Sequence, residues 1–135
     1  MSVPSYKRSQ SDLLIFREVQ SLSIDLIRML KSESVIPKRY SELIVPPIVD
    51  NLRNLMYSIH IANSINLNSI EERRLEQNKA KRMIQRLLVD LELVLRFDER
   101  GLNKIGAIID RLMIVRKTMD NWMKSDESRW KKLKT

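Results

Sequence analysis

The chain has 135 residues, of which 43% are hydrophobic and 31% charged, with 25 lysines and arginines against 17 acidic residues. This length suits one domain, and the apolar fraction is too high for a wholly disordered chain. Two glycines and four prolines are too few for the closely spaced turns of a β-sandwich or barrel, so long helices are expected. The absence of cysteine excludes disulfides, thiolate nucleophiles and cysteine-ligated zinc sites.

The formal net charge of +8 points to a polyanionic partner. Nucleic acid, an anionic membrane surface and an acidic protein all satisfy that charge. The N-terminal segment lacks the apolar core of a signal peptide, and no run approaches 18 continuous apolar residues. We therefore expect a cytoplasmic protein that has no membrane span.

Both ends of the chain are polar and basic. Residues 1–10 show no hydrophobic period and are expected to form a flexible basic arm. Residues 125–135 follow the last periodic position and are expected to form a basic tail. The folded domain is therefore predicted over 11–124.

The first two helices are predicted from apolar residues spaced alternately three and four apart, which is typical of one buried helix face. One helix is expected over 12–32. The other is expected over 39–66, with a kink or break at Pro46-Pro47, because proline lacks an N–H donor and disfavours helical geometry in the residue before it. The two apolar stripes are Ile15, Val19, Leu22, Leu26 and Met29, and then Val45, Val49 or Ile48, Leu52, Leu55 or Met56, Ile59 and Ala62.

The same spacing predicts two further helices, over 69–99 and 102–124. Gly101 lies between them and is expected to turn the chain in a left-handed conformation. Gly106 costs the last helix about 1 kcal/mol relative to alanine, unless close packing compensates. The two stripes are Ala80, Ile84, Leu87, Leu91 and Val94, and then Ile105, Ile108, Ile109, Leu112, Val115, Met119 and Trp122.

Four amphipathic helices joined by short connections predict an all-α, antiparallel, up-down-up-down four-helix bundle. Some apolar residues lie off the buried stripes, and exposed apolar patches commonly mark interfaces. We therefore expect a homo-oligomeric barrel of bundles, with scattered surface hydrophobes as the alternative. The candidate interface residues are Tyr57, Ile61, Leu93 and Ile114.

Basic residues concentrate in 71–86 and 96–117, each with six basic and three acidic side chains. The two segments belong to helices that neighbour each other in the chain, so we expect one cationic surface that follows a phosphate backbone. A solvated helix face is the alternative. The candidate nucleic-acid-binding residues are Arg73, Arg74, Lys79, Arg82, Arg86, Arg111, Arg116 and Lys117.

Motifs for catalysis or cofactor binding are missing from the sequence. His60 is the one histidine, and Tyr57 stands where the Glu-x-x-His signature of di-iron bundles requires glutamate. Glycine-rich phosphate loops and nucleophile elbows are absent. We therefore expect no catalytic residues, no metal and no other cofactor. We expect any bound nucleic acid to be contacted through its backbone and shape.

Four segments of the sequence stand out together: Ile36-Pro37-Lys38, the stretch 74–91, Ile105-Gly106 and Asn121-Trp122-Met123-Lys124-Ser125. They resemble the four-helix bundle protein family, which includes proteins encoded in 23S rRNA intervening sequences and the Avd accessory proteins of diversity-generating retroelements. The ending is closer to the Avd branch, and the resemblance covers about residues 12–125.

The resemblance implies a homopentamer with a strongly basic surface that binds a reverse transcriptase and its template RNA, and that has no catalysis of its own. Asp120-Asn121 stands where the family tends to have two glycines before the tryptophan. The partners expected are thus RNA, with DNA as an alternative, a reverse transcriptase and further copies of the chain. Two other functions stay open: a protein–protein adaptor with a basic docking face, and an rRNA-associated protein of the intervening-sequence branch.

Overall fold

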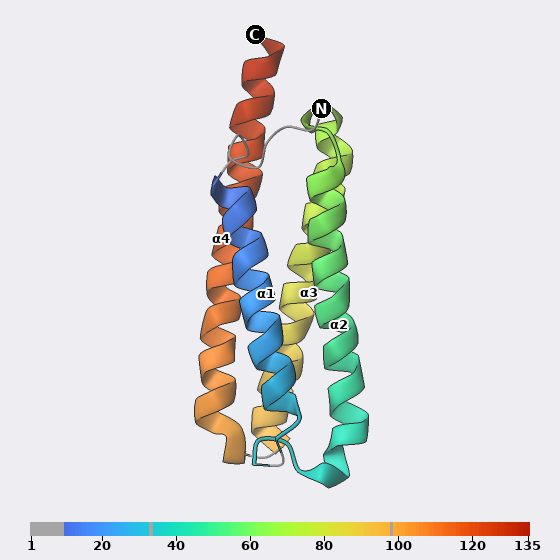
Figure 1. Ribbon diagram of the computed structural model, residues 1–135, viewed down its shortest axis with the longest axis vertical. Coiled ribbons are helices and arrows are strands. Elements are labelled where there is room, and N and C mark those ends of the chain that lie inside the picture. The colour runs from blue at the N-terminus through green and yellow to red at the C-terminus, as the bar shows by residue number, and fades with distance from the viewer. Residues whose placement is uncertain (1–9, 33, 98) are drawn as a thin grey trace.

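The computed structural model describes residues 10–32, 34–97 and 99–135, and these ranges contain helices and no strand (Figure 1). The predicted all-α class is therefore confirmed. The long helices are α1 (Gln10–Leu30), α2 (Lys38–Ser64), α3 (Ile70–Phe97) and α4 (Leu102–Lys134), and short 3-10 turns, η2 (Leu67–Ser69) and η3 (Glu99–Gly101), precede α3 and α4. The predicted arm, apart from Gln10, lies outside the described residues.

The four helices form an up-down-up-down bundle in which chain neighbours run antiparallel (Figure 1). Helix α2 shares its most extensive contact with α3, and α1 packs mainly on α4. Contacts between α3 and α4 and between α1 and α2 complete the ring. None of the described helices combines the length and apolar character needed to cross a bilayer.

The predicted apolar stripes form the core. Every stripe residue of α1 and α3 is buried, and so are most of those in α2 and α4. The stripe residues that are only partly buried, at the edge of the core, are Val45, Val49, Met56 and Ile109. Trp122 is among the largest fully buried side chains, so the last turns of the predicted fourth helix contribute as much to the core as its middle.

Helix α2 continues through Pro46 and Pro47, so the expected break does not occur. The two prolines cannot donate to the carbonyls of Glu42 and Leu43. Both prolines are exposed, and water can therefore satisfy those carbonyls. Packing of the buried residues that follow, beginning with Ile48, holds the helix together across the missing bonds.

Helix α4 extends ten residues beyond its predicted end at Lys124 and finishes at Lys134. The expectation that 125–135 forms a tail apart from the fold is therefore wrong. Asp126 lies seven residues after Met119, on the same buried stripe, and is fully buried. The final turns project past the ends of the other helices (Figure 1).

The two glycines of the chain differ in their surroundings. Gly101 has φ −96° and ψ 15°, so the expected left-handed conformation is wrong. A Cβ atom at Gly101 would instead lie 2.7 Å from Val35 Cγ1, which makes close packing the reason for glycine there. A Cβ atom at Gly106 would meet nothing within 4 Å, so nothing within the described chain compensates for the cost of this glycine.

Candidate nucleic-acid interface

The eight basic residues predicted to bind nucleic acid do not share one surface. One is buried, and the others divide among the seam between α3 and α4, the outer side of α3 and the side of α4 that faces α1. The buried residue is Arg73, and the residue that faces α1 is Arg111. Those at the seam between α3 and α4 are Arg74, Arg116 and Lys117. Those on the outer side of α3 are Lys79, Arg82 and Arg86.

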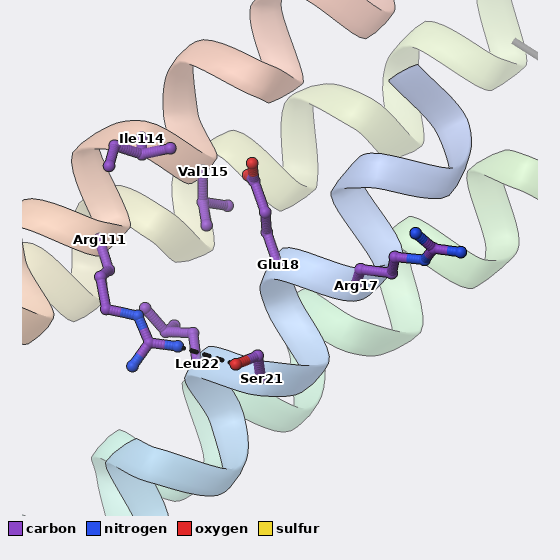
Figure 2. Close-up of a pocket in the computed structure, with 7 residues that line it drawn as sticks. All are labelled: Arg17, Glu18, Ser21, Leu22, Arg111, Ile114 and Val115. Atoms are coloured by element: carbon purple, nitrogen blue, oxygen red, sulfur yellow. Dashed lines mark hydrogen bonds between the residues drawn. The ribbon is translucent and has the colours of Figure 1, made fainter. Parts of the chain in front are cut away.

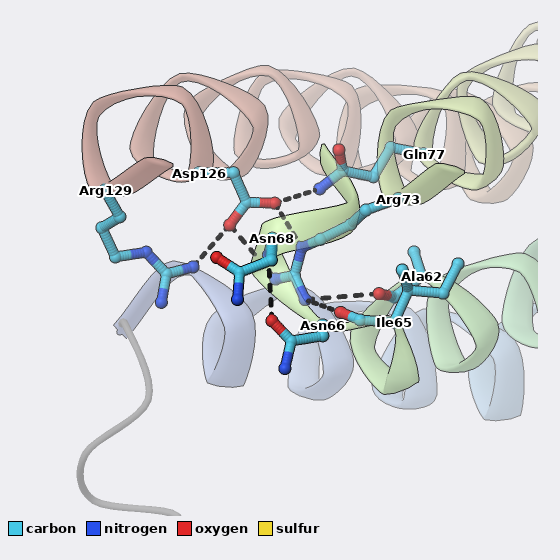
Figure 3. Close-up of polar contacts among 8 residues, drawn as sticks. All are labelled: Ala62, Ile65, Asn66, Asn68, Arg73, Gln77, Asp126 and Arg129. Atoms are coloured by element: carbon cyan, nitrogen blue, oxygen red, sulfur yellow. Dashed lines mark hydrogen bonds and ion pairs between the residues drawn. The ribbon is translucent and has the colours of Figure 1, made fainter. Parts of the chain in front are cut away.

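Arg73 is 5% exposed, so its prediction as a phosphate contact is wrong (Figure 3). Its Nε and Nη2 atoms donate to the two carboxylate oxygens of Asp126 at 2.6 and 3.1 Å. Its Nη1 atom donates to the carbonyls of Ala62 at 3.3 Å and Ile65 at 3.1 Å, at the C-terminal end of α2. The guanidinium also lies 5.3 Å from the centroid of the Trp122 ring.

Asp126 is the acceptor at the centre of this buried cluster. Besides Arg73, its carboxylate accepts a hydrogen bond from Gln77 Nε2 at 2.8 Å and another from Arg129 Nη2 (Figure 3). A buried charge is tolerated where it is paired and hydrogen-bonded. The cluster therefore joins α3, α4 and the end of α2, and it holds these helices together at one end of the bundle.

Three polar pairs link α3 to α4 along their seam. Arg74 Nη2 lies 3.4 Å from Glu127 Oε2, and Lys81 Nζ lies 2.8 Å from Asp120 Oδ1. The third pair is a hydrogen bond from Arg116 Nη1 to Gln85 Oε1 at 3.3 Å. Exposed pairs of this kind contribute about 0–1 kcal/mol each, so they leave their cations accessible to a stronger anionic ligand.

A row of lysines runs beside these pairs on α4. Lys117, Lys124 and Lys131 repeat every seven residues and are exposed, so successive members lie about 10.5 Å apart along the helix. Lys131 Nζ is 3.5 Å from Glu127 Oε1. Within the described ranges, Lys117 and Lys124 have no ion-pair partner.

The cations of the polar pairs and the row of lysines together form one elongated cationic surface, which we call the basic seam. Six basic side chains lie along it, and their acidic ion-pair partners are Asp120 and Glu127. The sequence analysis missed three of the six, although the seven-residue spacing from Lys117 could have found two of them. The basic residues are Arg74, Lys81, Arg116, Lys117, Lys124 and Lys131.

The segments that carry the family resemblance serve the packing of this bundle. Pro37 precedes the first residue of α2, and Trp122 lies beneath the guanidinium of Arg73. Asp120, where the resemblance leads us to expect a glycine, pairs with Lys81 across the seam. No protein-family model, no curated protein and no solved structure matches the chain.

Arg111 lies on the opposite flank of α4 from the basic seam. Its Nη1 atom pairs with Asp25 Oδ2 at 2.7 Å, and its Nη2 atom donates to Ser21 Oγ at 3.1 Å, both on α1. It borders a groove of about 320 Å³ between α1 and α4, into which Glu18 points beside Val115 and Ile114 (Figure 2). Arg111 cannot reach the same stretch of nucleic acid as the seam unless the strand crosses α4.

The four candidate interface residues are exposed, as their positions off the buried stripes predicted. Tyr57 and Ile61 lie on α2, Leu93 borders a hollow between α2 and α3, and Ile114 borders the groove between α1 and α4. The Tyr57 hydroxyl accepts a hydrogen bond from Arg53 at 3.2 Å, which raises the pKa of that guanidinium above its ordinary value. The four residues do not form one patch, and their contact with another subunit stays a prediction.

His60 contacts an aromatic ring. Its imidazole lies 4.7 Å, centroid to centroid, from the ring of Phe16, and the two planes are tilted by 40°. Over the described ranges no group of three histidine or acidic side chains is close enough to hold a metal ion. The contact with Phe16 gives this histidine a packing role between α1 and α2.

Proposed function

We propose that the protein is a non-enzymatic accessory protein that binds RNA along the basic seam. The observation that carries the proposal is the concentration of six basic side chains on one elongated surface, where Asp120 and Glu127 are their acidic partners. Two of these cations, Lys117 and Lys124, have no ion-pair partner in the part of the chain that the structure describes. Lysine and arginine rows of this kind bind phosphates without regard to sequence.

The mode of binding follows from the side chains on the seam. The residues that define the seam include no aromatic side chain, Trp122 is buried, and the partly exposed ring of Trp130 already has Lys134 Nζ 5.4 Å from its centroid. Single-strand platforms, by contrast, stack bases on open aromatic rings. The contacts proposed are therefore ionic, directed to the phosphate backbone and strongly dependent on salt concentration.

The identity of the RNA and of the protein partner comes from the family resemblance. It supports a retroelement role in the cytoplasm, in which the protein binds a reverse transcriptase and its template RNA. It also supports a homopentameric barrel, for which the exposed apolar residues Tyr57, Ile61 and Ile114 are available. A pull-down with a neighbouring gene product and light scattering for the subunit number test these two points.

The RNA proposal is tested by fluorescence anisotropy with a labelled single-stranded RNA over a range of salt concentrations. For the natural protein, log K is expected to fall linearly with log salt. In the variant Lys117→Glu/Lys124→Glu, the affinity falls and the slope decreases by about 1.4, because each lost contact removes about 0.7 from the slope on single strands.

The matched control is Arg17→Glu/Arg28→Glu, which reverses two exposed cations on α1. Each double variant changes the net charge by the same amount, so a general loss of attraction affects both alike. The proposal requires the α4 variant to lose clearly more affinity than the α1 variant. A flat salt dependence, or equal losses in the two variants, contradicts it.

A protein–protein adaptor is the second candidate function. It is favoured by the outer side of α3, where exposed apolar side chains lie on either side of two arginines, Arg82 and Arg86, that have no ion-pair partner among the described residues. If the protein bound no RNA at low salt but bound an acidic helical peptide on the outer side of α3, this result would favour the adaptor function over RNA binding.

A further inference from the structure

Helix α3 carries a second heptad series on its solvent side. The residues of α3 that face the core form a first series, the buried series, whose members are alternately four and three residues apart. The second series has the same spacings and is shifted by two residues, so it lies about 200° around the helix from the first. Each member of the buried series (Arg73, Gln77, Ala80, Ile84, Leu87, Leu91, Val94) is buried, and each member of the outer series (Leu75, Lys79, Arg82, Arg86, Val89, Leu93, Arg96) is exposed.

The apolar members lie toward the two ends of the outer series. Leu75 and Val89 are 53% exposed, and Leu93 is 57% exposed. Leu93 also borders a hollow of about 260 Å³ between α2 and α3, beside Leu43 and Pro47. Apolar residues at heptad spacing are the pattern by which one helix packs on another, and the hollow provides space for an entering side chain.

The middle of the outer series is cationic. Lys79 pairs with Glu76 on its own helix at 3.0 Å. Arg82 and Arg86 are exposed and have no ion-pair partner in the described part of the chain. A helix that covers this middle section must bring carboxylates, because cations buried at an interface without counter-charges are strongly unfavourable.

A second copy of the chain does not satisfy this requirement. Parallel pairing of two outer series places each arginine beside the same arginine of the other copy. Antiparallel pairing centred on Arg86 places this arginine beside the same arginine of the other copy, and pairing centred between Arg82 and Arg86 places both arginines of one copy beside those of the other. Like charges at an interface select against such pairing.

We propose that the outer series of α3 docks an acidic amphipathic helix of another protein. The docked helix places apolar side chains against Leu75, Val89 and Leu93, and carboxylates against Arg82 and Arg86. The inference goes beyond the proposed RNA binding, because it uses the outer side of α3 and not the basic seam, and it names the kind of partner that an adaptor would bind there. It assigns Lys79, Arg82 and Arg86, which the sequence analysis took for phosphate contacts, to a protein partner.

The test uses the full chain and a synthetic helical peptide with leucines opposite the three apolar members and glutamates opposite Lys79, Arg82 and Arg86. Fluorescence anisotropy is expected to show saturable binding, and a scrambled peptide of the same composition is expected to bind much more weakly. In Arg82→Glu/Arg86→Glu the affinity falls by about thirtyfold or more, as for the loss of buried interfacial charge pairs. A peptide with lysines in place of the glutamates restores binding to this variant.

The control is Lys117→Glu/Lys124→Glu, which makes the same change of charge on α4 and is expected to leave peptide affinity within about threefold. A third variant, Val89→Gln/Leu93→Gln, separates a helix from an RNA ligand. It lowers the affinity for the peptide by about tenfold, because apolar contact is lost, and leaves the affinity for single-stranded RNA unchanged. Circular dichroism confirms that each variant keeps its helical content.

Three results would overturn the proposal. One is equal binding of the designed and scrambled peptides. Another is a loss of RNA affinity in Arg82→Glu/Arg86→Glu as large as that in the α4 variant, which would make the outer series part of the RNA surface. The third is dissociation of an oligomer by Val89→Gln/Leu93→Gln in light scattering, which would show that a second copy covers α3. The RNA and peptide measurements are independent, so the failure of one proposal is distinguished from the failure of the other.

Discussion

The two ends of the bundle are closed in different ways. At the end where α2 turns into α3, the ion pair of Arg73 with Asp126 is buried and joins three helices (Figure 3). At the opposite end, Gly101 lies directly against Val35, where an added Cβ would be 2.7 Å from the valine methyl. The first end is weakened when a group is removed, since Arg73 would lose the carboxylate that accepts two of its hydrogen bonds. The second end is weakened when a group is added, since no space remains.

The largest expected effect is at the ionic end. Asp126→Ala leaves the guanidinium of Arg73 buried without its counter-charge, which is expected to lower the free energy of unfolding by about 3–5 kcal/mol. Urea denaturation measures this loss. Asp120→Ala removes the exposed partner of Lys81 and is the matched control, with an expected loss of less than about 1 kcal/mol.

A double variant shows whether the charge or the packing is responsible. Arg73→Met/Asp126→Leu removes both charges and keeps similar volumes, so its free energy of unfolding is expected to lie much closer to that of the natural protein than that of Asp126→Ala. A double variant as unstable as the single one would mean that the hydrogen bonds to Ala62 and Ile65 hold this end, and not the ion pair.

At the apolar end, Gly101→Ala is expected to lower the free energy of unfolding by about 1–3 kcal/mol through overpacking. The φ of −96° is ordinary for alanine, so backbone strain does not contribute. Val35→Ala removes the methyl groups that the new Cβ would meet. In the double variant the two losses should be far from additive in denaturant unfolding, and additive losses would argue against the contact.

The smallest effect has the opposite sign. Gly106→Ala makes the same chemical change in the middle of α4, where the new Cβ meets nothing within 4 Å. Alanine is the better helix former by about 1 kcal/mol, so the melting temperature is expected to rise. A fall in melting temperature that depends on protein concentration would instead reveal that Gly106 packs against another chain.

Hydrophobic spacing was sufficient to predict the four helices and their buried faces. The same spacing could have placed the ionic cluster as well. Arg73 lies seven residues before Ala80 and Asp126 seven residues after Met119, so both continue a buried stripe in spite of their polarity. The pairing of these two residues depends on the register of α3 against α4, which one sequence does not contain.

The distribution of the cations was only partly predictable for a related reason. Lys79, Arg82 and Arg86 are spaced three and four residues apart, and the structure exposes all three on one face of α3. Arg111 was assigned to the same surface because its helix follows α3 in the chain, whereas in the structure it pairs with Asp25 of α1. The course of α2 through its two prolines is also a tertiary effect, because buried residues beyond them outweigh the local preference against helix.

The length of α4 changes what a late stop codon would do to this protein. The helix has 33 residues, which corresponds to about 50 Å. A chain that ended at Ser125 would lose ten residues, most of them hydrophilic and at least partly exposed. It would also lose the carboxylate of Asp126, to which Arg73 donates. A deletion that the hydropathy of the residues would predict to be harmless is therefore expected to destabilise the core.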